Sequence, residues 1–354
     1  MVNLQCDIYV KSLHAFSDRK YRSRKSVFAR VILKTRIYLI YPLKCILVLI
    51  FQGRNYDAFL VVTSPFFLPA LCAWISGKPI ISLQNDIFPE ALIQARIITR
   101  KSFLERILTR FCAYGITRAA SVVYLCESHR ELAETSLGRN AHTHIIPVGA
   151  IGVEFEDNLP ALSAKPLTFI YCGTLGLMHD SQTIESYLLT KILPEGCHLE
   201  FFTSGAGKLK FEERLRNNCP VLLSDKTVVL GNALENDAWS SKMKSAHIGM
   251  VFQSIGAENV VFPSKVFSVL VAGQAVLAIV SPECELGRLI IYHDCGWVVP
   301  PGDLDELDKA FHESLDGEIL LRKRRNAFEL GHSRYNVDVL ASRWHSVLMN
   351  SCSG

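Results

Sequence analysis

Residues 262–290 read FPSKVFSVLVAGQAVLAIVSPECELGRLI and predict a helix, a buried strand and a second helix in succession. The apolar run 266–272 follows a turn-forming proline and a serine, and it stops at Gly273, as a helix with a glycine just past its end should. Residues 275–280 are apolar without interruption, which is typical of a strand covered on both faces. The stretch therefore indicates an α/β protein.

Lys265 stands directly before the first of these two helices. A helix N-terminus carries partial positive charge and free N–H groups, so a lysine beside it can help to hold a doubly charged phosphate. The other interpretation is an ordinary helix–strand–helix segment with a surface lysine, and the pattern alone favours that plainer interpretation.

Strands alternate with helices on both sides of this stretch. The sequence predicts strands over 57–62, 80–83, 121–125 and 144–148 in the first half, and over 167–172, 199–203, 227–230, 248–252, 276–280 and 296–299 in the second. Between them, Phe103, Ile107, Leu108, Phe111 and Gly115 have the spacing of an amphipathic helix over 102–119, and a capping box of Ser128 and Glu131 predicts the next helix. This order indicates βαβ units and parallel sheets.

Two domains fit the chain length of 354 residues. The acidic, proline-containing segment 153–166 predicts a linker between an N-terminal domain (1–152) and a C-terminal domain (167–330). We expect residues 331–354 to form a helix that packs back on the N-terminal domain.

Composition excludes several classes of protein. Hydrophobic residues make up 49% and charged residues 20%, as in folded globular chains rather than disordered ones. The 11 cysteines are scattered without a CxxC pair or the spacing of a zinc site, which favours a reducing, cytosolic compartment. The first residues also lack the pattern of a signal peptide.

Positive charge is concentrated at the beginning of the chain. Residues 1–56 contain eleven lysines and arginines against two aspartates, hence +9, and the remainder of the chain is −5. Residues 36–51 are strongly apolar but contain Pro42 and Lys44. Such a segment suits either an anionic membrane surface, contacted through residues 11–54, or a core helix with a solvated basic flank. No nucleic-acid recognition motif is present, so we expect no nucleic-acid partner.

Five ordered segments carry a resemblance to a known family: YCGTLGLMHDSQTI (171–184), FTSGAG (202–207), VVLGNA (228–233), FPSKVFSVLVAGQAVLA (262–278) and CGWVVPPGD (295–303). Together they resemble the donor domain of retaining glycosyltransferases of family 4, which have the GT-B fold. In the first half, SLQNDIFPEAL (82–92) and YLCESHREL (124–132) resemble the acceptor domain. The resemblance implies two tandem Rossmann-like domains facing a cleft, with the first βαβ unit of the N-terminal domain missing.

The same resemblance implies a site for a nucleotide diphosphate sugar. Lys265 matches the residue that meets the diphosphate, and a glycine-rich loop matches the backbone that passes close to phosphate and sugar. In the acceptor domain, Asp86 and Glu90 match residues facing the cleft that could orient an acceptor hydroxyl. The implied donor-binding set is Gly173, Thr174, Leu175, Gly176, His179, Asp180, Asn232, Ala233, Ser264, Lys265, Glu283 and Glu285.

Charge decides the expected chemistry. A departing nucleoside diphosphate develops negative charge, which a lysine and backbone N–H groups can stabilise without a metal ion. Asp303 and Asp305 have the Asp-x-Asp spacing of metal-dependent transferases, but they stand where a helix cap is the simpler account. We therefore expect neither a metal nor another cofactor. We expect the basic run 322–325 to be a solvated helix face, and contact with a phosphate or a membrane is the other interpretation.

The leading hypothesis is a cytoplasmic, peripheral membrane glycosyltransferase that moves a sugar to a lipid-linked saccharide or polysaccharide of the cell envelope. A second hypothesis is a non-catalytic subunit, either a scaffold or a truncated pseudo-enzyme with a GT-B shell. A third is a nucleotide-sugar epimerase of similar fold, which would turn over the donor without an acceptor.

Overall fold

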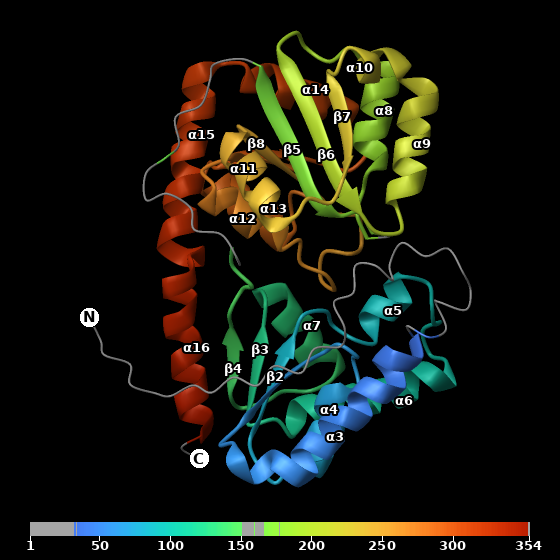
Figure 1. The fold of residues 1–354 in the computed structure, drawn as a ribbon, viewed down its shortest axis with the longest axis vertical. Coiled ribbons are helices and arrows are strands. Elements are labelled where there is room, and N and C mark those ends of the chain that lie inside the picture. Colours follow the sequence, from blue (N-terminus) through green and yellow to red (C-terminus); the bar gives the residue numbers. More distant parts are fainter. Residues whose placement is uncertain (1–31, 33, 151–158, 160–165, 177, 353–354) are drawn as a thin grey trace.

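The computed structural model describes residues 32, 34–150, 159, 166–176 and 178–352, which form two α/β domains stacked along the long axis of the molecule (Figure 1). The N-terminal domain contains a parallel sheet of four strands and the C-terminal domain a parallel sheet of six. This confirms the predicted fold class of two parallel-sheet domains. The predicted linker lies outside the described residues, apart from positions 159 and 166.

The C-terminal sheet has the order β10-β9-β8-β5-β6-β7. The chain enters in the middle at β5, proceeds to one edge, and then returns to build the other half from β8. In a doubly wound sheet, the change of direction between the first and fourth strands leaves a crevice at their carboxyl ends. The strands are β5 (Leu167–Thr174), β6 (Cys197–Ser204), β7 (Val228–Asn232), β8 (Ile248–Phe252), β9 (Ala275–Ile279) and β10 (Gly296–Val299).

Helices cover both faces of this sheet, which explains the uninterrupted apolar run of β9. Ala275, Leu277 and Ile279 belong to one core cluster. Val276 and Ala278 point to the opposite face and belong to the other cluster. The helices are α8 (Gln182–Thr190), α9 (Lys208–Asn218), α10 (Pro220–Ser224), α11 (Asn236–Ser245), α12 (Lys265–Val271), α13 (Glu285–Tyr292), α14 (Leu304–Ser314) and α15 (Gly317–Leu330).

The N-terminal sheet has the order β1-β2-β3-β4. Ile80 of β2 packs in a cluster with α4, and Val122 of β3 packs in a cluster with α6 and α7. The strands are β1 (Phe59–Val62), β2 (Ile80–Gln84), β3 (Ser121–Tyr124) and β4 (Thr143–Ile145), and the helices are α4 (Leu68–Ile75), α5 (Glu90–Gln94), α6 (Phe103–Thr117) and α7 (Glu127–Ser136). The absence of a first βαβ unit stays a prediction.

The last helix, α16 (Val337–Cys352), lies against the N-terminal domain. It follows α15 through the π-helical turn η3 (Gly331–Tyr335), and the two helices run as one column beside both domains in Figure 1. Leu340 and Val347 of α16 pack against Ile81 and Val123. These two strand residues directly follow Ile80 and Val122, so their side chains point to the face of the sheet opposite α4 and α6. The C-terminal segment thus supplies the cover for the second face of the N-terminal sheet.

A long apolar helix precedes β1. It consists of η1 (Arg36–Ile40), α3 (Tyr41–Gln52) and η2 (Gly53–Asn55), and by length and composition this stretch could cross a membrane. Cys45 packs against α4 in the N-terminal core, whereas Leu43, Leu47 and Phe51 are exposed. One side of the helix is therefore part of the fold and the other is open. Residues 11–31 and 33 of the basic segment lie outside the described residues.

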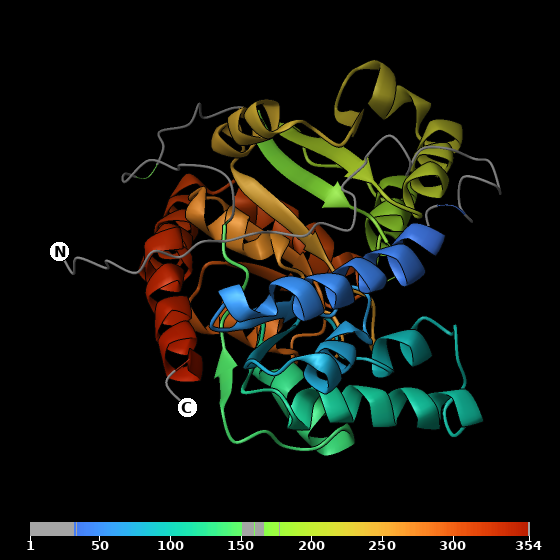
Figure 2. The same ribbon diagram turned by 60° about the horizontal axis from the view of Figure 1, so that its bottom comes forward.

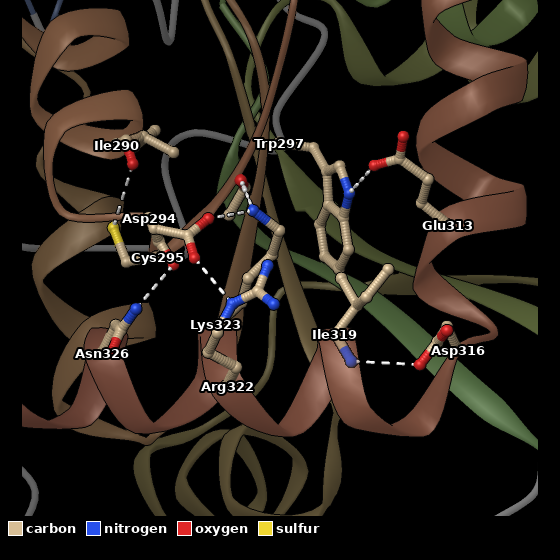
Figure 3. Close-up of polar contacts among 11 residues, drawn as sticks. Ile290, Asp294, Cys295, Trp297, Glu313, Asp316, Ile319, Arg322, Lys323 and Asn326 are labelled. Carbon is tan, nitrogen blue, oxygen red and sulfur yellow. Dashed lines mark hydrogen bonds and ion pairs between the residues drawn. The ribbon is translucent and has the colours of Figure 1, made fainter.

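The prediction that residues 322–325 form a solvated face is wrong for half of them (Figure 3). Lys323 is buried, and its ammonium group donates to Asp294 Oδ1 at 2.5 Å and to the carbonyl of Gly296 at 2.9 Å. Arg324 is also buried and donates to the carbonyl of Gly273. These two side chains attach α15 to the sheet, because they satisfy carbonyls and a carboxylate that flank β9 and β10.

Two helix starts test the predicted caps. Asp303 accepts a hydrogen bond from the backbone N–H of Glu306, so the predicted capping role is confirmed. The predicted capping box of Ser128 and Glu131 is wrong. Helix α7 begins earlier, at Glu127, and has no side-chain cap from its own N-cap residue, Cys126. The cap comes instead from the other domain, as described below.

Candidate functional site

The candidate site lies where the carboxyl ends of the two sheets meet. Asp86, just after β2, forms an antiparallel bridge with Val261, which belongs to the loop after β8. The N–H of Ile87 donates to the carbonyl of Val260. Figure 1 shows the strands of both sheets directed toward this boundary. The carboxyl ends of β5 and β8, where the strand order reverses, therefore face the N-terminal domain.

Lys265, the first residue of α12, reaches back to the end of β5. Its ammonium group donates to the carbonyl of Thr174 at 3.0 Å and lies 5.0 Å from the centre of the Tyr171 ring. Burial lowers the pKa of Lys265 to about 8. The side chain therefore stays mostly protonated at neutral pH, in a poorly hydrated place where its charge acts strongly on a neighbouring anion.

His179 completes this cluster. Its Nδ1 accepts a hydrogen bond from the N–H of Gly176, and its Nε2 lies 3.2 Å from Lys265 Nζ. Burial, with the nearby Lys265 charge, lowers the pKa of His179 to about 4, so the ring is neutral at pH 7. With Nδ1 accepting, the ring proton sits on Nε2. Two donors then face each other, and an anionic oxygen placed against both would satisfy them.

Gly173 makes the close approach of Lys265 possible. Its φ is +132°, and a Cβ at this position would lie 2.7 Å from Cε of Lys265. Only glycine has both the conformational freedom and the space here. Gly205 has the same function one strand away, because a Cβ there would lie 2.7 Å from the carbonyl oxygen of Leu175. The glycines therefore allow two loops and a lysine to pack together.

Three predicted donor residues organise the surrounding loops. Asp180 accepts from the N–H of Gln182 at 3.1 Å and from the hydroxyl of Thr183, which fixes the start of α8. Asn232 ends β7, two strands from β5, and accepts from Lys208 at 2.6 Å. The N–H of Ala233 donates to the carbonyl of Thr203. These contacts fix the start of α8 and tie the end of β7 to that of β6.

The remaining predicted donor residues differ in their surroundings. The N–H of Leu175, a buried residue, donates to the carbonyl of Ser204 at 2.7 Å. Ser264 makes no capping hydrogen bond to α12. Glu283 is exposed. The structure thus brings Gly173, Thr174, Gly176, His179 and Lys265 into one cluster, with the other predicted donor residues in the surrounding loops.

Glu285 bridges the two domains. Its carboxylate accepts hydrogen bonds from the backbone N–H groups of Glu127 at 3.1 Å and of Ser128 at 2.8 Å. These are free amides at the start of α7, which the partial positive charge of the helix makes a favourable place for a carboxylate. Glu285 therefore caps a helix of the N-terminal domain from the C-terminal domain.

Removing this carboxylate should loosen the domain boundary. In Glu285→Ala we expect hydrogen exchange at the amides of Glu127 and Ser128 to become at least about tenfold faster, because they lose their acceptor. The free energy of unfolding should fall by about 1 kcal/mol, a typical cost of losing a cap. Site-resolved hydrogen exchange measures the first effect. Glu283→Ala, an exposed neighbour, is the control, and unchanged exchange in Glu285→Ala would refute the bridge.

The two predicted acceptor-side carboxylates have different environments. Asp86 is partly buried at the domain boundary, and burial raises its pKa to about 6. Glu90 is buried, and both of its oxygens accept from the guanidinium of Arg100, at 2.6 and 3.3 Å. The Glu90 carboxylate is therefore engaged in holding the 94–102 loop, whereas Asp86 lies next to the C-terminal domain.

Two residues near the site, Lys208 and His129, were not among the site residues predicted from the sequence. Lys208 donates to the carbonyls of Thr203 and Gly231 as well as to Asn232, and so ties the ends of β6 and β7 together. Its position directly after the SGAG loop (204–207) was the available signal. His129 is fully buried, and among the described residues neither ring nitrogen has a hydrogen-bond partner. Burial lowers its pKa to about 4.

Two further features of the described residues are the lack of a metal site and the position of a cavity. No group of three or more His, Cys, Asp or Glu side chains could hold a metal ion within the described ranges. A cavity of about 440 Å³ is lined by residues that include Ile192, Cys197, Cys219 and Val221. These residues surround the amino ends of β6 and β7, which is the opposite edge from Lys265. Ligands of open α/β sheets bind at the carboxyl edge.

Comparisons with known proteins agree with this architecture. No protein-family model matches the chain. The chain is 24% identical over 300 residues to "Probable glycosyltransferase WbjE" of Pseudomonas aeruginosa. The matched stretch covers 81% of this chain and 71% of the relative.

Solved structures give a closer match in shape than in sequence. The structure of HepE (Alr3699) from Anabaena in complex with UDP matches with a TM-score of 0.68 at 13% identity, over 89% of this chain and 84% of that one. WaaG, a glycosyltransferase involved in lipopolysaccharide biosynthesis, matches with a TM-score of 0.56 at 14% identity, over 75% and 76% of the two chains. The chain therefore has the GT-B fold, two parallel-sheet α/β domains facing each other as in the structures of HepE and WaaG.

Proposed function

We propose that the chain is a glycosyltransferase that takes a sugar from a nucleotide diphosphate sugar. The observation that carries this proposal is the cluster at the crevice between β5 and β8, where Lys265 and His179 present N–H donors beside a glycine-rich loop. The relative WbjE is named a probable glycosyltransferase, and HepE has been solved with UDP in a chain of the same fold. Both support a nucleotide-sugar donor.

The cluster suits the stabilisation of a leaving diphosphate. When the bond to the anomeric carbon breaks, negative charge grows on the β-phosphate oxygen. Lys265 supplies a full positive charge, and the Nε2–H of His179 supplies a second donor next to it. We propose that these groups act without a metal ion. Retention at the anomeric carbon and membership of family 4 belong to the proposal through the resemblance of residues 171–184 and 262–278.

On the acceptor side, we propose that Asp86 orients the attacking hydroxyl. Its position after β2 at the boundary with Val261 supports this role. Its raised pKa keeps the carboxylate within reach of proton exchange near neutral pH. We assign Glu90 a positioning role instead, because its ion pair with Arg100 holds the neighbouring loop. The acceptor would be a saccharide of the cell envelope, carried on a lipid.

A lipid-linked acceptor implies work at a membrane surface. We propose that the protein is cytoplasmic and attaches peripherally through residues 11–54. The exposed side chains Leu43, Leu47 and Phe51 of α3 support this, and Lys44 and Arg54 add positive charge.

Donor binding and transfer give separate tests. We expect UDP or GDP to raise the melting temperature, since a ligand at 100 times its Kd adds about 2.7 kcal/mol of stability. Membranes containing the chain should transfer radiolabelled sugar from the matching donor into lipid-extractable product. Nucleotide binding without transfer would favour the non-catalytic scaffold. Conversion of the donor to another sugar without an acceptor would favour the epimerase. No stabilisation by any nucleotide would refute the proposed donor site.

A further inference from the structure

Helix α6 has an apolar face that the described part of the chain leaves uncovered. Its inner side packs closely, because a Cβ on Gly115 would lie 2.8 Å from the backbone nitrogen of Ala70 in α4. On the outer side Phe103 is 79% exposed and Phe111 49% exposed, and Ile107 is exposed between them. The helix is therefore firmly held by one side while it presents large apolar side chains to solvent on the other.

Arginines border this outer stripe. At about 100° per residue, positions 103, 107 and 111 follow one another along one side of a helix, and positions 106 and 110 lie directly beside them. Arg106 and Arg110 are exposed, and within the described part of the chain neither makes an ion pair. Residues 95–118 as a whole contain six basic side chains and one acidic one: Arg96, Arg100, Lys101, Arg106, Arg110 and Arg118 against Glu105.

We propose that α6 docks on an anionic lipid bilayer, with Phe103, Ile107 and Phe111 inserted at the headgroup boundary and Arg106 and Arg110 against lipid phosphates. An apolar stripe flanked by cationic side chains is the arrangement that binds such surfaces. This contact is additional to residues 11–54. Helices α3 and α6 both pack on α4, so the two elements belong to one helical layer of the N-terminal domain (Figures 1 and 2).

Charge favours lipid over a second copy of the chain on this face. Two copies placed face to face would bring their excess arginines together, which is unfavourable, whereas anionic headgroups neutralise them. The purpose of this docking rests on the proposed function, because a lipid-linked acceptor for sugar transfer lies at such a surface. Binding to lipid is measured without donor or acceptor, so it can fail or succeed independently of transfer.

The test is co-sedimentation of the full chain with vesicles made of phosphatidylcholine alone or of equal parts phosphatidylcholine and phosphatidylglycerol. The variant Phe103→Ser/Ile107→Ser/Phe111→Ser should lower the partition coefficient on mixed vesicles at least about tenfold, because three side chains lose their apolar burial. The variant Arg106→Gln/Arg110→Gln should lower it on mixed vesicles and leave binding to phosphatidylcholine unchanged.

Matched controls come from the C-terminal domain. Ile192 is 90% exposed and Tyr292 is 84% exposed, and serine at both positions should leave vesicle binding as in the wild type. The melting-temperature shift with UDP or GDP, whichever stabilises the wild type, should stay normal in all variants on the same preparations, which separates α6 from the donor site. Wild-type vesicle binding by the triple-serine variant would overturn the proposal. A second result would also overturn it. In that case sedimentation velocity without lipid would show that the wild type is a dimer, and the triple-serine variant would be a monomer that still binds vesicles.

Discussion

Replacing Lys265 by alanine is expected to lower the rate of sugar transfer about 100- to 1,000-fold, the usual cost of removing one preorganised donor from a developing negative charge. The ammonium group sits in a partly buried position, against the carbonyl of Thr174 and beside His179, where no other lysine or arginine makes a contact among the described residues. Steady-state transfer of radiolabelled sugar measures the loss. The melting-temperature shift with nucleotide should also shrink, because the diphosphate loses its counter-charge.

Two further variants separate charge from packing. Lys265→Met keeps most of the side-chain volume and should be as inactive as the alanine variant. Lys309→Ala removes an exposed lysine from α14 and should transfer sugar as the wild type does. Because burial lowers the pKa of Lys265, the loss of this charge should if anything favour the folded state, so both variants should stay folded. Undiminished transfer in Lys265→Met would refute the assigned role.

Much of the fold could be predicted because the sequence records it locally. Uninterrupted apolar runs such as 275–280 marked strands buried on both faces, and all ten predicted strands are present, with ends within a few residues of those expected. The pairing of the 173–176 loop with Lys265 could be placed only through the resemblance, because the two lie about ninety positions apart. The structure adds the geometric reason, which is the space that Gly173 leaves for the lysine.

The interactions that could not be predicted join distant segments. Glu285 looked like a donor-pocket residue because it follows β9, yet its carboxylate accepts hydrogen bonds from backbone N–H groups of α7 in the other domain. Lys323 and Arg324 looked like half of a solvated basic run, because nothing in the run itself distinguishes the two that face the sheet. Spacing identified α6 as amphipathic, but it could not tell that the stripe at 103, 107 and 111 faces solvent.

Replacing Gly173 by alanine is expected to impair transfer although every charged group remains. The new Cβ would occupy space within 2.7 Å of Lys265 Cε, so the flexible side chain has to move and its ammonium group leaves the position beside His179. A φ of +132° is also strained for any residue with a Cβ, which should lower the free energy of unfolding by about 1–3 kcal/mol. We expect the transfer rate to fall at least about tenfold.

Gly302→Ala separates the two effects of that substitution. Gly302 also has a positive φ, +89°, but a Cβ there would meet nothing within 4 Å. Its alanine variant should therefore lose stability through backbone strain and still transfer sugar normally, as judged by denaturant unfolding and transfer assays on both proteins. If the two variants are equally destabilised and only Gly173→Ala loses transfer, the position of the lysine matters beyond its charge. Equal transfer by both variants would mean that catalysis tolerates displacement of Lys265, and the role assigned to this cluster would then be wrong.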